Sequence, residues 1–400
     1  MPAAKKHTII RAILILSAAF IYYYIIRFAP LRFKGILDHV FSLSDFNGYL
    51  ETGTHFFSSH LPGAGYLYSA FAGLLFVPFK FFGYGEAFLA WTLVEMLLLT
   101  VICLLPPSPR FQTLYVCLMV TSFPMISNME WGQVGLFITT TILAAHWLYW
   151  RGKRTASAML LAMVAAFKYY PFIFVVYYLG KRDWRTALKF AAFLGLFFFV
   201  LPMLAIGPAN WLEFQQTTMQ SAMKILIGDY SSHYLEHVMM RVFPSLYEWA
   251  AVITYGSIAL AVLNAGLVYL MQLLAERRKA DAEAYLWDAL LLSVIFLTLP
   301  LLVQTSWAHY FIYLPFCQVA VFTQAYTLYR QKSYVALPLA IMVAFSALLS
   351  NPLSIVFFAD WYEYNSWGAL CWADMILLVA IYVIAAQRLL AGGLRMQRSN

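Results

Sequence analysis

The sequence Ser44-Asp45-Phe46-Asn47-Gly48-Tyr49 is a short polar stretch between two long apolar runs, and this alternation decides the fold. The run before it, Thr8–Phe28, is long enough to cross a bilayer as a helix, and Gly65–Phe82 after it has the same character. Asp45 therefore lies where a membrane enzyme can hold a catalytic base at the lipid surface. The alternative is an aspartate in an exposed loop, or at the N-cap of a helix over residues 47–54.

The composition indicates an integral membrane protein. Hydrophobic residues make up 63% of the chain and charged residues 11%, whereas soluble domains average about 25% charged residues. Apolar runs of about 20 residues recur from one end of the sequence to the other, as in helical membrane proteins. We therefore expect an all-α fold, a polytopic helical bundle that forms a single membrane domain over residues 1–400.

We count twelve apolar segments, with a first outer loop at about 29–64 and a large outer loop at about 207–246. The segments run over about 8–28, 65–82, 87–105, 111–127, 133–150, 156–179, 186–206, 247–274, 286–303, 309–329, 334–354 and 367–391.

The basic residues predict the orientation. Most basic loops fall on one side together with Lys5-Lys6 and the C-terminal tail, and that side is the cytoplasm by the positive-inside rule. Because these residues occupy short loops between helices, the net charge of +8 indicates contact with anionic membrane lipids and no nucleic-acid partner. The basic loop Arg151–Arg154 breaks the pattern, so the exact number of crossings stays open.

Lys168 stands in the middle of the apolar run 156–179, three residues before Pro171. A charge inside a membrane is costly unless it faces a polar cavity or a partner, and a lysine is a compact point charge suited to a lipid phosphate. The alternatives are snorkelling to a headgroup, or pairing with Glu95 or Asp374 in other apolar runs. The proline predicts that the helix breaks here into two halves.

Two further polar positions are candidates for substrate contacts. Asn128 and Gln133 belong to a short segment between two apolar runs, where their amides could hydrogen-bond sugar hydroxyls and Trp131 could stack on a sugar ring. His309 lies at an outer helix end, where it could donate to a phosphate oxygen or hold a hydroxyl. All of these residue types, Trp307 included, are also common in the aromatic belt at membrane interfaces.

Several kinds of site are not indicated by the sequence. The pair His233-x3-His237 in the large outer loop lacks a supporting carboxylate geometry, so we expect no metal. The four cysteines lie in apolar segments without a Cys-x-x-Cys motif, and we interpret them as core residues. There is no glycine-rich nucleotide loop and no Gly-x-Ser-x-Gly elbow, so we expect no cofactor and no chemistry driven by a cytosolic nucleotide.

The order of these landmarks resembles a known family. The matching pieces are Asp45 with Tyr49 (Asp-x3-Tyr), Gly65-Tyr66-Leu67-Tyr68 with Pro78, Gly132-Gln133, Lys168-Tyr169-Tyr170-Pro171, Lys181-Arg182-Asp183-Trp184-Arg185, and Ser306–Tyr310 (Ser-Trp-x-His-Tyr). In this succession the chain resembles the GT-C superfamily of membrane glycosyltransferases and, within it, glycosyltransferase family 87. The proline-rich run that is usual near Tyr66 is thin here, with Ala64, Ser69 and Ala70 where prolines are often seen.

The resemblance implies a GT-C-type bundle of about twelve transmembrane segments with its active site in the outer loops. It implies transfer of a hexose, mannose in the type members, from a polyprenyl-phosphate donor to a lipid or glycan acceptor. The expected location is the outer side of a bacterial inner membrane. Asp45 would be the general base, and Lys168 and His309 would lie at the phosphate. Tyr49, Gln133 and Trp307 would also bind substrate.

Two other functions fit the composition. A polytopic transporter or lipid flippase has as many spans, and charge pairs between spans without a required outer-loop carboxylate would favour it. A membrane polysaccharide polymerase or ligase also has one large outer loop, but such proteins depend on outer-loop arginines, and here that loop offers Arg241 alone.

Overall fold

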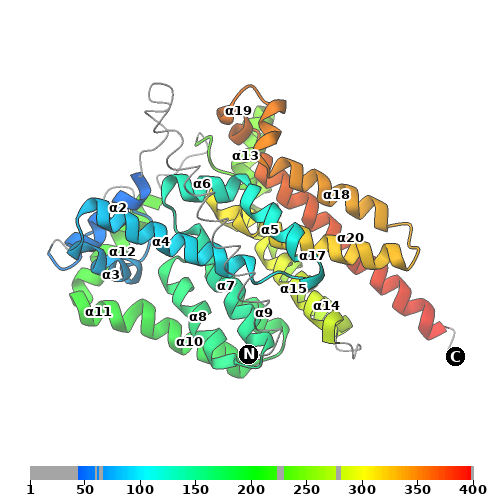
Figure 1. The fold of residues 1–400 in the computed structure, drawn as a ribbon, viewed down its shortest axis with the longest axis horizontal. Helices are drawn as coiled ribbons and strands as arrows, with labels where there is room; N and C mark the ends of the chain where they lie inside the picture. The colour runs from blue at the N-terminus through cyan, green and yellow to red at the C-terminus, as the bar shows by residue number, and fades with distance from the viewer. Residues whose placement is uncertain (1–43, 59–60, 63–65, 223–228, 276–280, 398–400) are drawn as a thin grey trace. The chain divides into compact units, whose positions relative to one another are not determined.

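The structure is a computed structural model that describes residues 44–58, 61–62, 66–222, 229–275 and 281–397. Every regular element among these residues is a helix, which confirms the all-α class (Figure 1). The described residues fall into two compact units. The first lies within the ranges up to Leu105, Pro124–Ile173 and Trp184–Leu226, and the second within Pro106–Phe123, Phe174–Asp183 and Ile227 onward. The apolar run Thr8–Phe28 lies outside the described residues.

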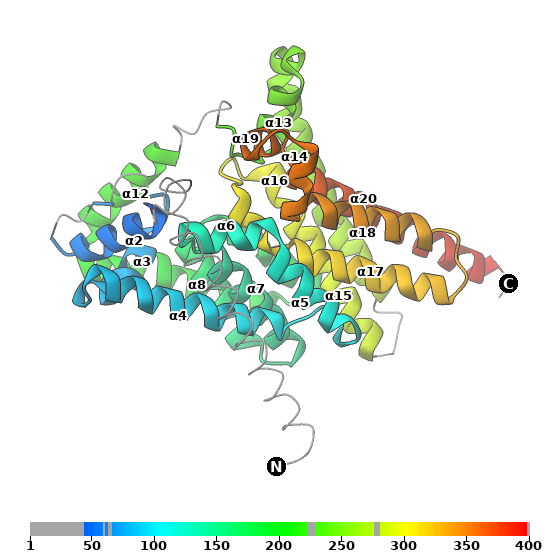
Figure 2. The same cartoon turned by 45° about the horizontal axis from the view of Figure 1, so that its top comes forward.

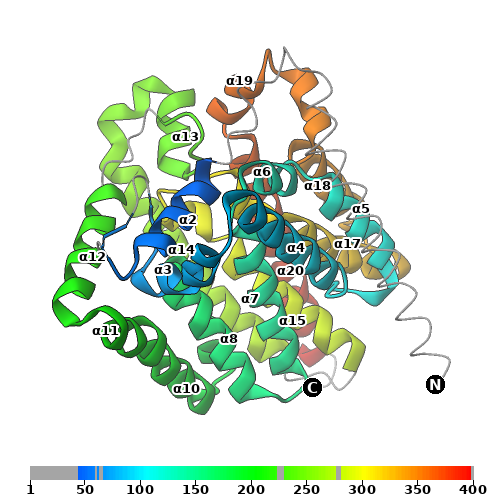
Figure 3. The ribbon, with the colours of Figure 1, turned by 60° about the vertical axis from the view of Figure 1, so that its left-hand side comes forward.

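The first unit contains the segments for which the sequence predicts a catalytic role. Its helices are α2 (Ser44–His55), α3 (Ala70–Phe76), η2 (Val77–Phe81), α4 (Tyr84–Cys103), α6 (Phe123–Trp131), α7 (Gly135–Trp150), α8 (Arg154–Phe167), η4 (Tyr170–Phe174), α10 (Trp184–Gly195), η5 (Leu196–Val200), α11 (Leu201–Ile206) and α12 (Pro208–Ala222). Helix α2 packs on α3, and α7 packs on α8, as Figure 3 shows.

The second unit holds most of the C-terminal half of the chain. Its helices are η3 (Pro109–Phe111), α5 (Gln112–Thr121), α9 (Val175–Gly180), α13 (Leu235–Val242), η6 (Pro244–Trp249), α14 (Ala250–Ala275), α15 (Asp281–Phe296), α16 (Leu299–Leu302), η7 (Ala308–Tyr313), α17 (Leu314–Arg330), α18 (Ala336–Leu349), η8 (Pro352–Phe357), α19 (Trp361–Ser366) and α20 (Ala369–Gln397). Helix α17 packs between α15 and α18, and α18 also packs on α20 (Figure 2).

Six helical segments among the described residues are long and apolar enough to cross a membrane. They are Gly85–Cys103, Trp184–Ile206, Pro244–Leu273, Ala284–Leu302, Ala308–Arg330 and Ala369–Leu390. The other predicted runs within the described residues form shorter or broken helices, because hydropathy alone does not detect a helix end inside an apolar stretch. The run 111–127 is interrupted between α5 and α6, and the run 156–179 between α8 and α9. The count of about twelve crossings therefore stays a prediction.

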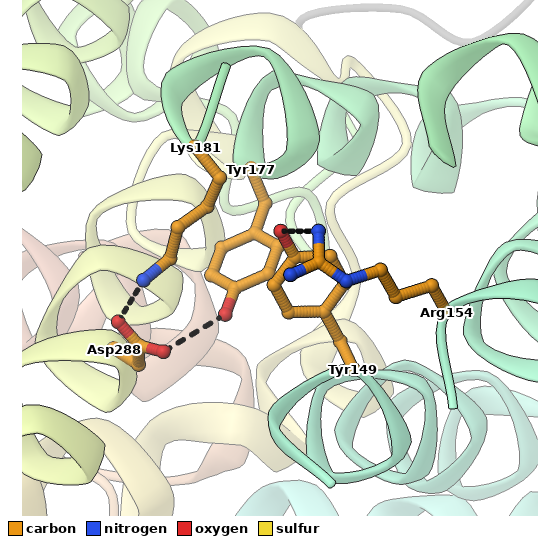
Figure 4. A network of polar contacts seen from close by, with 5 residues as sticks. All are labelled: Tyr149, Arg154, Tyr177, Lys181 and Asp288. Carbon is orange, nitrogen blue, oxygen red and sulfur yellow. Dashed lines mark hydrogen bonds and ion pairs between the residues drawn. The ribbon is translucent and has the colours of Figure 1, made fainter. Parts of the chain in front are cut away.

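In each unit, polar side chains near helix ends form hydrogen bonds or ion pairs with neighbouring helices, and Figure 4 shows two examples. In the first unit, the guanidinium of Arg154 at the start of α8 donates to the hydroxyl of Tyr149 near the end of α7, over 3.3 Å. In the second unit, Lys181 just after α9 forms a partly buried ion pair with Asp288 on α15. The hydroxyl of Tyr177 donates to the same carboxylate over 3.3 Å. Lys181, the first residue of the Lys181–Arg185 loop, thus has a structural partner in Asp288.

Helix α2 lies against α3 and η2 with almost no space between them. Its buried positions are Phe46, Tyr49, Thr52 and Gly53, at the spacing of one helix face, and Phe56 just after the end of the helix is also buried. A Cβ atom at Gly53 would lie 2.5 Å from the carbonyl oxygen of Phe76. The glycine therefore lets α2 approach the end of α3 closely, and this approach fixes the helix that carries Asp45.

Replacing Gly53 by Ala is expected to lower the stability of the protein. The new methyl group would meet backbone atoms of Phe76, which cannot rotate away, and such overpacking typically costs about 1–3 kcal/mol. The melting temperature in detergent should fall. Gly85→Ala on α4 is the control, because a Cβ there meets nothing within 4 Å. Equal melting temperatures for the two variants would contradict the close packing of α2 on α3.

Candidate functional site

Asp45 and Tyr49 lie one turn apart on α2. Asp45 is in the first turn of this helix, where a negative charge is favoured by the helix dipole. The aspartate is half-buried and Tyr49 is buried. The ring of Tyr49 stacks on Phe76, with ring centroids 5.1 Å apart. The alternative of an aspartate in an exposed loop is wrong, since Asp45 belongs to a helix and is partly covered.

Gln133 stands in the tight turn between α6 and α7. Gly132 has a backbone φ of 64°, a conformation that residues with a side chain rarely adopt. The backbone N–H of Gln133 donates to the carbonyl oxygen of Asn128 over 2.9 Å. The turn directs the Gln133 side chain to α2, where its amide nitrogen donates to Oδ2 of Asp45.

Lys168 lies at the break predicted in the run 156–179. Helix α8 ends at Phe167, and Lys168 has extended backbone angles before η4 begins at Tyr170, so the predicted break is confirmed. Ser69, the N-cap of α3, donates its hydroxyl to the carbonyl oxygen of Ala166 and its backbone N–H to that of Phe167. These bonds hold Lys168, the residue after Phe167, beside Tyr68, the residue before Ser69.

The residue before Ser69 is Tyr68, and it connects Lys168 to the rest of the site. The ammonium of Lys168 donates to the hydroxyl of Tyr68 over 3.0 Å and lies 4.1 Å from the centroid of the same ring. The hydroxyl of Tyr49 lies 2.8 Å from that of Tyr68 and donates to Oε1 of Gln133 over 2.7 Å. An unbroken series of hydrogen bonds thus leads from the ammonium of Lys168 to the carboxylate of Asp45.

The charge state of Asp45 reflects opposing influences. Burial raises the pKa of this carboxyl above its ordinary value, because the charged form loses hydration. The hydrogen bond from Gln133 and the positive charge of Lys168 act in the other direction and offset part of that rise. The result is a carboxylate that is more basic than an ordinary aspartate and is still close to a cation.

His309 and Trp307 belong to the second unit. His309 is buried in η7, and its ring centroid lies 4.9 Å from that of Tyr310 and 6.0 Å from that of Trp307. The indole N–H of Trp307 donates to Oδ2 of Asp229 over 2.9 Å. Burial raises the pKa of Asp229, but hydrogen bonds from Ser231 and Trp307 and the charge of Arg241 bring it below the ordinary value. Trp307 thus helps to keep Asp229 ionised in the segment predicted to be the large outer loop.

The structure brings four of the predicted site residues into one network: Asp45, Tyr49, Gln133 and Lys168. It adds Tyr68, which the sequence analysis includes only in the run Gly65-Tyr66-Leu67-Tyr68, without a role of its own. Asn128, a candidate for sugar binding, is fully buried, and its side chain bonds to Glu95 and to the backbone of Leu136. Because the nitrogen and the oxygen of the Asn128 amide both bond within the protein, Asn128 supports the turn and does not bind a sugar.

This network can do two kinds of chemistry. A carboxylate with a raised pKa can accept a proton from a hydroxyl group. An ammonium and tyrosine hydroxyls can stabilise a negative charge that develops on an oxygen atom. Within the described residues, no group of three or more histidine, cysteine or acidic side chains could hold a metal ion.

Comparison with known proteins identifies the family. The chain matches no curated protein and no solved structure significantly. The sequence profile of glycosyltransferase family 87 matches residues 66–303, which is more than half of the chain. The matched range includes Tyr68, Gln133 and Lys168 and begins after α2. The chain belongs to glycosyltransferase family 87.

Proposed function

We propose that this membrane glycosyltransferase transfers a hexose, specifically mannose, from a polyprenyl-phosphate donor to a lipid or glycan acceptor. Membership of the family favours a transferase over a transporter or flippase. The observation that supports the proposal best is the network that joins a half-buried carboxylate, Asp45, to a buried ammonium, Lys168. A base and a cation at one site are what a sugar transfer from a phosphate carrier needs.

In the proposed reaction Asp45 is the general base. The acceptor hydroxyl is a poor nucleophile until its proton is removed. Gln133 holds Oδ2 of Asp45, and a carboxylate can also accept on its second oxygen, so Oδ1 takes the acceptor proton. The bond from the acceptor oxygen to the anomeric carbon forms on the face opposite the breaking bond, which inverts the configuration.

The leaving group in this reaction is the polyprenyl phosphate. As the bond between the anomeric carbon and the phosphate oxygen breaks, negative charge grows on that oxygen, and Lys168 stabilises it. Tyr49 and Gln133 bind the sugar hydroxyls. His309 and Trp307, which belong to the second unit, remain proposed substrate-binding residues.

We propose that the reaction takes place at the outer face of a bacterial inner membrane. Support comes from the six apolar helices and from the basic loops that mark the cytoplasmic side. Donors carried by a lipid suit this location, because nucleotide sugars are cytosolic and the sequence has no nucleotide-binding glycine loop.

The decisive experiment incubates purified protein in nanodiscs with polyprenyl-phosphate mannose or polyprenyl-phosphate glucose and a membrane lipid extract as acceptor. We expect release of polyprenyl phosphate together with a new glycosylated product, and more of both from the mannose donor. A nucleotide sugar as the sole donor should give none. Release of the phosphate from neither lipid donor, with transfer from the nucleotide sugar, would overturn the proposed donor class.

A further inference from the structure

Helix α4 contacts both elements that meet at Asp45. Trp91 on this helix is buried, and its ring stacks on Phe46, the residue next to Asp45, with centroids 5.8 Å apart and an angle of 21° between the rings. The indole N–H of the same residue donates to the carbonyl oxygen of Gly132 over 3.1 Å. A single side chain therefore touches the helix that carries Asp45 and the turn that carries Gln133.

Glu95, one turn further along α4, supports the same turn. Its carboxyl oxygen Oε1 accepts from the side-chain nitrogen of Asn128 over 3.1 Å. The side-chain oxygen of Asn128 accepts from the backbone N–H of Leu136 over 2.9 Å, which is one of the N–H groups left without a partner at the start of α7. Glu95 thus orients the Asn128 amide on α6, whose oxygen bonds α7 across the turn.

We propose that Trp91, supported by Glu95, is a positioning residue that sets the side chain of Gln133 against Asp45. This inference rests on the proposed function, in which Asp45 is the base. The turn has a glycine in the left-handed conformation, and the indole N–H of Trp91 holds the carbonyl of this glycine, immediately before Gln133. Stacking on Phe46 holds α2 at the matching position.

The consequence concerns how strongly Asp45 holds its proton. A hydrogen bond to the ionised form of a carboxyl favours that form, so a displaced Gln133 makes Asp45 easier to protonate. The titratable groups on the elements packed against α2 are few. Lys80 on η2 lies over the ring of Phe57 at 5.5 Å, Glu51 and His55 are exposed on α2 itself, and Lys168 acts on Asp45 through its charge.

The test compares Trp91→Phe with Trp211→Phe. Phenylalanine at position 91 keeps an aromatic ring against Phe46 and removes the N–H. Trp211 also donates its indole N–H to a backbone carbonyl, that of Phe198 over 3.0 Å, and it packs on aromatic rings away from Asp45. The two substitutions therefore delete the same kind of bond, one beside the site and one elsewhere.

For Trp91→Phe we expect kcat to fall about tenfold, since displaced catalytic groups react more slowly, and the acid limb of the kcat/KM profile to move to higher pH. Trp211→Phe should keep the wild-type profile. Glu95→Leu should move the acid limb in the same direction, whereas Glu95→Gln, which keeps an oxygen for Asn128, should restore it. An unmoved acid limb in both Trp91→Phe and Glu95→Leu would overturn the inference.

A second measurement separates this inference from the proposed function. Dicyclohexylcarbodiimide reacts with protonated carboxyl groups, and mass spectrometry of the peptide containing Asp45 gives the labelled fraction as a function of pH without any sugar transfer. We expect Trp91→Phe to extend labelling to higher pH. If wild-type protein transfers no sugar but labelling still shifts, the proposed function fails and the positioning role stands. If transfer occurs and labelling does not shift, the positioning role fails.

Discussion

Asp45→Asn should leave a folded protein whose turnover is lower by about 10²–10⁴-fold, the usual contribution of a general base. The substitution keeps the size of the side chain and an oxygen that can accept the hydrogen bond from Gln133. It removes the ability to take the acceptor proton. Measured by release of polyprenyl phosphate, kcat should collapse while the donor still protects the protein against thermal unfolding, which shows that binding persists.

Asp45→Asn, together with the further variant Asp45→Glu, separates catalysis from a local role of Asp45 at the start of α2. Asn is about as good as Asp near a helix start, so a purely structural role predicts normal turnover for Asp45→Asn. Asp45→Glu should retain little activity, because one added methylene displaces the carboxylate from its productive position. Near-wild-type transfer by a folded Asp45→Asn protein would remove the assignment and leave Glu51, exposed on the same helix, as the next carboxylate to test.

Lys168→Met should lower turnover by about 10²–10³-fold and move the pH profile. Methionine keeps the length of the stem and loses the charge that stabilises the leaving phosphate in the proposed reaction. Asp45 must be ionised to act as a base, so kcat/KM falls as the pH drops through its pKa. The charge of Lys168 lowers that pKa. Its removal raises the pKa further, and the acid limb should therefore move to higher pH.

Lys153→Met is the matched control for Lys168→Met. Lys153 is exposed just before α8, and Lys168 follows the end of the same helix. The same loss of charge therefore occurs at the opposite end of α8, away from the network. The control should keep both the rate and the acid limb of the wild type. If Lys168→Met transferred sugar with unchanged kinetics, the lysine would be a structural residue held by Tyr68.

The sequence predicts the parts of this structure that depend on local chemistry. Continuous apolar runs correspond to long helices such as Gly85–Cys103 and Ala369–Leu390, because length and hydropathy are local properties. Pro171 marks the break beside Lys168 for the same reason, since a proline removes a backbone donor within its own helix. The choice of Asp45, Gln133 and Lys168 as one group came from the resemblance to a family and not from spacing.

What the sequence does not reveal depends on contacts between distant residues. Tyr68 bonds to Lys168, 100 positions away, and nothing near Tyr68 indicates this partner. Trp91 lies within an apolar helix and is indistinguishable there from any other core or lipid-facing aromatic residue. The interpretation of Cys117 as a core residue is wrong, because its side chain is exposed on the surface. Hydropathy in a membrane protein does not separate the lipid-facing surface from the core, because both are apolar.

The division of the chain into two units has a consequence for how the protein is made. The chain passes from one unit to the other at Leu105, Phe123, Ile173, Asp183 and Leu226, so neither unit is a continuous segment that could be expressed by itself. Asp45 leaves the ribosome roughly 120 residues ahead of Lys168. At translation rates of about 5–20 residues per second, that delay lasts about 6–25 s. During this interval the nascent chain carries Asp45, the proposed base, without Lys168, and only later synthesis completes the pair.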